Sequence, residues 1–71
     1  MDRIPVVSSN VASIGYCNET GILEVEFNNG GIYQYFGIPD FLYHEFLNSD
    51  SKGRFLNTNV KQAGYNYAKV G

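Results

Sequence analysis

Apolar and polar residues alternate along the first half of this chain at the spacing of a β-strand. Residues 22–27 read ILEVEF, in which three apolar side chains would face one way and two glutamates the other. β-branched and aromatic residues favour two further strands, at residues 11–17 (VASIGYC) and 32–36 (IYQYF). Asn- and Gly-rich turns separate the three, at residues 18–21 and 28–31. The pattern predicts a three-stranded antiparallel meander.

The second half carries apolar residues at helical spacing. A proline and an aspartate, both suited to a first helical turn, open a helix over residues 39–49. A second short helix is expected over residues 51–62, whereas the tail, residues 63–70, fits a short strand or an extended wrap. Residues 1–10 form an extended entry. The fold class is therefore α+β: a three-stranded antiparallel β-meander followed by one or two short helices packed on one face, in a single domain over residues 1–71.

Tyr33 and Tyr35 share one face of the third predicted strand, and the register decides which face is buried. A two-residue turn at Asn29-Gly30 pairs Phe27 with Ile32 and places both tyrosines on the outer face, beside the glutamates. A three-residue loop that adds the next glycine pairs Phe27 with Tyr33 instead, and the tyrosines join the core. We favour the first register, because it leaves the apolar set intact.

Tyrosines on an outer face have three interpretations. They cover the sheet and hydrogen-bond the neighbouring glutamates, which is the commonest role of such side chains and the one we favour from these residues alone. They form a platform on which a nucleic-acid base stacks, worth about 1–3 kcal/mol per base. They form a surface through which copies of the chain associate.

Composition narrows the function classes. A chain of 71 residues that is 44% hydrophobic and 15% aromatic indicates one small folded domain. Five basic against seven acidic residues do not support tight binding to long nucleic acid. One cysteine and one histidine, Cys17 and His44, provide neither a disulfide nor a metal set, and no nucleophile–base motif is evident. We expect no enzyme activity, metal or cofactor, no membrane segment, a cytoplasmic location and, because so small a core is thin, a homo-oligomer.

Two polar segments are candidate ligand sites. The hydroxyls of Ser8 and Ser9 are suited to a ligand oxygen, although turn capping is their commoner role. A helix that starts near Ser51 would combine free N–H groups with basic side chains into an anion site, or form an ordinary N-cap followed by solvated residues. The residues of this second site are Ser51, Lys52, Gly53, Arg54, Asn57 and, as an extension, Lys61.

The ordered segments VSSNVASIGY, LEVEF, GIYQY, IP, SKGRFLN and VK resemble the KTSC domain, over about residues 6–67. This short domain occurs at the C-terminus of some lysyl-tRNA synthetases and as a free-standing protein in bacteria and phages. The resemblance implies a small α+β domain without established enzyme activity, for which RNA binding has been suggested. Cys17 departs from the family pattern, which more often has aspartate there.

The residue pattern and the resemblance to the KTSC domain together predict a non-catalytic binding protein for a nucleotide-type ligand. Aromatic residues would stack on the base, and a small basic site would hold the phosphate. By analogy with phage proteins, a free-standing copy would sequester a nucleotide immune signal. The alternatives are a module for short single-stranded RNA and a protein-interaction module. The predicted ligand-binding residues are Ser8, Ser9, Tyr16, Tyr33, Tyr35, Phe36, Ser51, Gly53, Arg54, Asn57 and Lys61.

Overall fold

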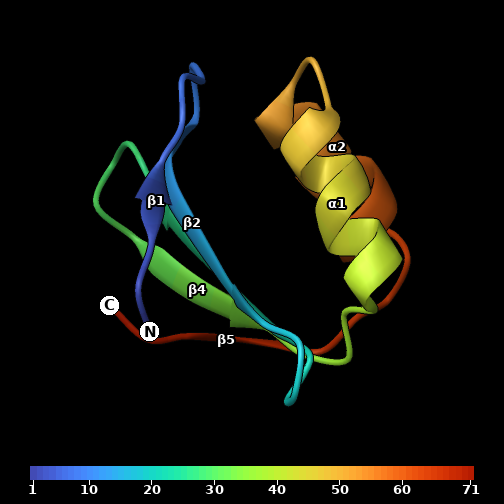
Figure 1. The fold of residues 1–71 in the computed structure, drawn as a ribbon. Helices are drawn as coiled ribbons and strands as arrows, with labels where there is room; N and C mark the ends of the chain where they lie inside the picture. The colour runs from blue at the N-terminus through green and yellow to red at the C-terminus, as the bar shows by residue number, and fades with distance from the viewer.

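The computed structural model describes residues 1–71 and shows one curved sheet with helices on one side (Figure 1). All neighbouring strands are antiparallel, and the strand order β1-β2-β3-β4-β5 follows the chain. The strands are β1 (Ile4–Pro5), β2 (Val11–Cys17), β3 (Ile22–Phe27), β4 (Ile32–Tyr35) and β5 (Tyr67–Lys69). The helices are α1 (Asp40–Asn48), α2 (Lys52–Leu56) and a π-helical continuation, η1 (Asn57–Lys61).

The sheet has five strands, so the predicted class is confirmed but the predicted number of three is wrong. The two added strands are the sheet edges, β1 and β5, which contain two and three residues, all exposed. Because these strands bury no side chain, they leave no alternation in the sequence. Backbone hydrogen bonds attach them instead, such as Val6 N to Ala12 O (3.1 Å) beside β1 and Val70 N to Ile32 O (2.8 Å) beside β5.

The hairpin between β3 and β4 has a register that differs from both predicted ones. Leu23 pairs with Tyr35 and Val25 with Tyr33, so the tyrosines lie on the apolar face of the sheet, and the favoured outer-face placement was wrong. The loop contains residues 28–30: Phe27 N donates to Gly31 O at 2.8 Å. The glycine that ends this loop has φ +95°, which an Asn-Asn-Gly loop supplies without strain.

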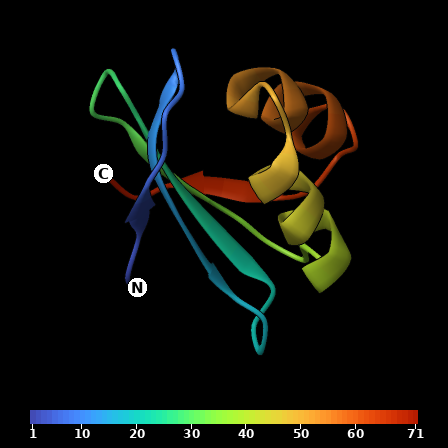
Figure 2. The ribbon, with the colours of Figure 1, turned by 45° about the horizontal axis from the view of Figure 1, so that its top comes forward.

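The core lies between the sheet and the helices, which occupy one side of it in both views (Figure 2). A bulge in β2 shifts its register between Val11 and Ser13, so Val11 and Ile14 both reach the core despite their odd spacing. Both predicted helices are present; Pro39, in extended conformation, caps α1 rather than starting it. Ten residues form the buried core: Val11, Ile14, Leu23, Val25, Tyr35, Ile38, Leu42, Phe46, Leu56 and Val60.

The opposite face of the sheet carries a polar network. Glu24 is buried, and Gln34 Nε2 donates to its Oε1 at 2.8 Å, while the Arg3 guanidinium pairs with its Oε2. Arg3 also donates to Ser13 Oγ (2.9 Å), which in turn donates to Glu26 (2.8 Å). The network joins β2, β3 and β4 to the segment that precedes β1, and it pairs the charge of Arg3 with that of Glu24.

Candidate functional site

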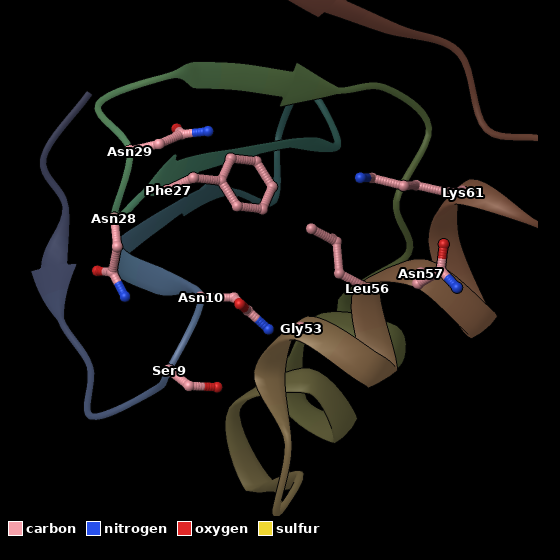
Figure 3. A pocket seen from close by; sticks show the side chains of 9 residues that line it. All are labelled: Ser9, Asn10, Phe27, Asn28, Asn29, Gly53, Leu56, Asn57 and Lys61. Atoms are coloured by element: carbon pink, nitrogen blue, oxygen red, sulfur yellow. The ribbon is translucent and has the colours of Figure 1, made fainter.

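A polar hollow of about 510 Å³ lies between the end of the β3–β4 hairpin and the second helical segment (Figure 3). Most of its lining side chains are amides or hydroxyls, which both donate and accept hydrogen bonds. The lining residues are Ser9, Asn10, Phe27, Asn28, Asn29, Gly53, Leu56, Asn57 and Lys61.

Local turn chemistry shapes the near wall of this hollow. Ser8 Oγ accepts hydrogen bonds from the backbone N–H groups of Asn10 and Val11, both at 3.2 Å, and so sets the turn that presents Ser9 and Asn10. Asn10 points toward Gly53 (Figure 3), where a Cβ atom would lie 2.6 Å from Asn10 Nδ2. Gly53 therefore permits the close approach of α2 to this turn.

An aromatic hollow of about 480 Å³ adjoins the polar one, since the two share Phe27, Asn29 and Lys61. Its remaining walls are the rings of Tyr33, Tyr35 and Tyr67. These four rings form a connected cluster with centroid separations of 5.7 Å (Phe27–Tyr33), 6.5 Å (Tyr33–Tyr35) and 5.9 Å (Tyr35–Tyr67). Tyr67 is 62% exposed on the edge strand and offers a free ring face. We call the two hollows together the groove.

Lys61 lies at the junction of the two hollows. Its ammonium group is 5.4 Å from the centroid of the Phe27 ring, toward which its side chain points in Figure 3. The two ion pairs of the protein, Arg3–Glu24 and His44–Asp40, do not involve it. It is the only cation that lines the groove, and it is unpaired.

The Tyr35 side chain is the buried member of the aromatic cluster. The residue is 1% exposed, and its hydroxyl oxygen is buried without any hydrogen-bond partner. Burial, together with smaller contributions from charge repulsion by the phenols of Tyr33 and Tyr67, raises the pKa of this phenol to about 12. The group is therefore protonated, and able to donate, throughout the physiological pH range.

The structure brings more than half of the predicted ligand-binding residues to one groove. Those residues are Ser9, Tyr33, Tyr35, Gly53, Asn57 and Lys61. The predicted helix-start anion site is divided: Gly53, Asn57 and Lys61 line the groove, whereas Ser51 and Arg54 line a separate hollow of about 290 Å³ after the end of α1. Ser51 Oγ accepts from Arg54 N at 3.3 Å, which is the ordinary N-cap that the sequence offered as the alternative.

Three other predicted residues line no hollow. Ser8 caps its own turn, as described above. The Tyr16 hydroxyl donates to Ile38 O at 2.6 Å and its ring stacks on Tyr43, with centroids 4.4 Å apart, which ties β2 to α1. Phe36 is half-buried at the end of β4, where its N–H bonds to the tail. Their contacts lie within the turn before β2, between β2 and α1, and between β4 and the tail.

Several residues of the groove are not among those predicted from the sequence. Tyr67 could not be placed beside Tyr35 because the exposed tail carried no clear strand pattern. Phe27 was assigned to the core through its alternation, yet it is only half-buried and separates the two hollows. The other missed residues are Asn10, Asn28, Asn29 and Leu56, of which the asparagines were read only as turn residues.

Features outside the groove add little chemistry. Cys17 is partly exposed, and a hydrogen bond from the Thr20 side chain lowers its pKa. His44 pairs with Asp40 one turn away on α1, at 3.1 Å, and both side chains are exposed. No three His, Cys, Asp or Glu residues gather in a metal-binding arrangement. None of the helices has the length and apolar character needed to cross a bilayer.

The fold and groove define a small α+β domain with a mixed aromatic and amide-rich hollow. The sequence model of the KTSC domain matches residues 7–70, and the chain belongs to the KTSC domain family. The crystal structure of a KTSC domain protein from Yersinia pestis superposes with a TM-score of 0.92 at 38% identity, covering 99% of this chain and 97% of that one.

Three other proteins are similar to this chain in sequence. An uncharacterized protein of Stutzerimonas stutzeri is 39% identical over 70 residues, 99% of both chains. A protein of Tsukamurella paurometabola is 37% identical over 57 residues, 80% of this chain and 85% of that one. A lysine–tRNA ligase of Nostoc punctiforme is 32% identical over 53 residues, which are 75% of this chain but only 9% of the ligase.

Proposed function

We propose that the groove binds a nucleotide-type ligand without chemical change, with the base in the aromatic hollow and the phosphate at Lys61. The observation that carries this proposal is the junction itself: an unpaired ammonium group stands between a ring cluster and an amide-lined hollow. A base stacks on exposed rings such as Tyr67. Asparagine amides and the Ser9 hydroxyl suit sugar and phosphate oxygens.

The residues of the groove also support binding rather than catalysis. No carboxylate, histidine or thiol lines either hollow, so general acid–base chemistry would have only phenols and one lysine to draw on. A single cation matches a ligand with one phosphate better than a triphosphate. The proposed ligand class is therefore a mononucleotide or a ligand that contains one such unit.

The test is a titration of the wild-type protein with AMP, GMP, CMP and UMP, in which calorimetry or NMR measures binding. Replacement of Lys61 by alanine is expected to weaken binding about tenfold or more, because a hydrogen bond to a charged group contributes about 1.5–3 kcal/mol. Tyr67→Ala is expected to weaken it by a similar factor through lost stacking. Both positions are exposed, so we expect the variants to fold.

Matched controls exist for both variants. Arg54→Ala removes an exposed cation from the same helical run, outside the groove. Phe41→Ala removes a ring with an exposure of 64%, close to the 62% of Tyr67, from α1. Both controls should bind as the wild type does. Failure of all four nucleotides to bind the wild type would refute the proposal.

Single-stranded RNA is the second candidate, and the lysine–tRNA ligase relative is the observation in its favour. The same rings would stack bases one after another along a short strand. The sparse positive charge of the groove stands against a long strand. Salt dependence separates the two candidates, because each phosphate contact adds to the loss of affinity with salt.

A further inference from the structure

The Tyr35 hydroxyl is an anomaly in an otherwise well-paired structure. It is the one buried side-chain polar atom of the protein that has no hydrogen-bond partner. A buried polar group left unpaired destabilises the folded state, so such a group calls for a physical explanation. The core offers no reason for it, because phenylalanine would fill the same space without the penalty.

The position of Tyr35 supplies the explanation. Its ring forms part of the wall of the aromatic hollow, between Tyr33 and Tyr67, whose phenols act on it electrostatically. Of these neighbours, Tyr67 is the one that can turn aside, since it is 62% exposed on a three-residue edge strand. A base that stacks on the Tyr67 ring and shifts it outward would therefore come within reach of the hydroxyl.

We propose that Tyr35 is the specificity-determining residue of the groove, whose hydroxyl donates a hydrogen bond to an acceptor atom on the aromatic ring of the ligand. The inference rests on the proposed function and refines it: the ligand ring carries a carbonyl oxygen or an unprotonated ring nitrogen, as nucleobases do, and an acceptor-free ring is discriminated against. The free protein holds the donor ready and unpaired. A ligand ring with an acceptor gains a hydrogen bond from this donor, whereas an acceptor-free ring leaves the donor unpaired, as it is in the free protein.

Stability of the free protein provides the first test. Tyr35→Phe should raise Tm by about 4–8 °C, because it removes an unpaired buried hydroxyl and keeps the ring. The matched control is Tyr16→Phe, which removes a hydroxyl that has a partner, Ile38 O, and should lower Tm. A fall in Tm for Tyr35→Phe, like that of the control, would show that the hydroxyl is already satisfied without ligand and would overturn the inference.

Binding provides the second test, with AMP as the acceptor-bearing probe and 1-naphthyl phosphate as a flat bicyclic phosphate without a ring acceptor. Tyr35→Phe should weaken AMP binding about three- to tenfold and leave 1-naphthyl phosphate binding unchanged. Equal effects on both probes, or no effect on AMP, would overturn the role of the hydroxyl while leaving nucleotide binding in place. A wild type that binds 1-naphthyl phosphate as well as or better than AMP would overturn the preference for an acceptor. A wild type that binds neither probe would refute the proposed function and this inference with it.

Discussion

Glu24 lies at the centre of the polar network on the outer face of the sheet and is only 7% exposed. The hydrogen bond from Gln34 is the largest influence that lowers its pKa, and Arg3 adds a hydrogen bond and its charge; burial acts in the opposite direction. The ionised form is thus better held in the folded protein than in the unfolded chain.

The lowered pKa of Glu24 predicts that the folded protein loses stability in acid. Because the folded-state pKa lies below the unfolded value of about 4.3, the unfolded chain binds more protons in that window, and stability falls as pH falls. The contribution of Glu24 is complete above the unfolded pKa and is lost as pH drops through the folded one. Thermal unfolding measured from pH 7 to pH 2.5 should show Glu24→Gln losing part of the acid slope of the wild type.

The control for this prediction is Glu45→Gln, which changes the same charge at an exposed position on α1. It should leave the acid slope close to that of the wild type. Equal slopes for the wild type and Glu24→Gln would contradict the assignment.

Predictions about single residues were correct where they depended only on neighbouring positions in the sequence. The alternation in residues 22–27 placed both glutamates on the face opposite the apolar residues, as observed. It could not show that Arg3 and Gln34 would meet Glu24, since Gln34 comes from another strand and Arg3 from the segment that precedes β1. The unpaired hydroxyl of Tyr35 has no sequence signal at all.

At the scale of elements, the β3–β4 hairpin determines where the groove aromatics lie. Its register follows from the three-residue loop, in which Asn29 Oδ1 accepts from Gly31 N at 3.0 Å and Gly30 has φ +95°. A shift of one residue would turn Tyr33 and Tyr35 to the opposite face. The loop geometry is therefore a condition for the site.

Replacing Gly30, or the neighbouring Gly31, by alanine tests this geometry. Gly30→Ala should destabilise the protein by about 1–2 kcal/mol, because an L residue is strained at that positive φ while the space around it is open. Gly31→Ala is the matched neighbour: its φ is not positive and the nearest atom to an added Cβ lies 3.3 Å away. Chemical denaturation should show a clearly larger loss at position 30, and equal losses would count against this account of the register.

Elements with buried faces were predictable, and edge elements were not. The central strands and both helices follow from apolar periodicity, and Ser51 caps its helix as its residue type suggests. β5 is entirely exposed, so nothing in the sequence separated a strand from an extended tail. That uncertainty concealed Tyr67, which only the edge pairing brings beside Tyr35.

At the scale of the whole molecule, charge separates the candidate ligands. The chain has a net charge of −2, and Lys61 is the one cation that lines the groove. Arg3 is neutralised by Glu24, and Lys52 donates to Ser49 O at 2.7 Å. Self-association of the chain stays a prediction. In an oligomer, the groove of each copy would have the same single lining cation.

One groove cation predicts weak salt dependence. For single-stranded nucleic acid, each neutralised phosphate contributes a slope of about −0.7 in log K against log salt, so binding of a short oligouridylate should weaken only about threefold between 50 and 200 mM salt. Fluorescence anisotropy with a labelled oligomer measures this slope. A loss of a hundredfold or more would require several phosphate contacts and would favour the RNA module over the mononucleotide site.

The sequence by itself determined the α+β class, the central strands, the helices and the family resemblance, because each rests on local periodicity or on residues in a fixed order. Tertiary structure alone decided the hairpin register, the two edge strands and the meeting of Phe27, Lys61 and Tyr67 in one groove. The physical reason is distance along the chain. Pairing between remote segments depends on backbone hydrogen bonds and loop geometry, which many side chains would permit, whereas burial of a strand or helix face leaves a pattern in the residues themselves.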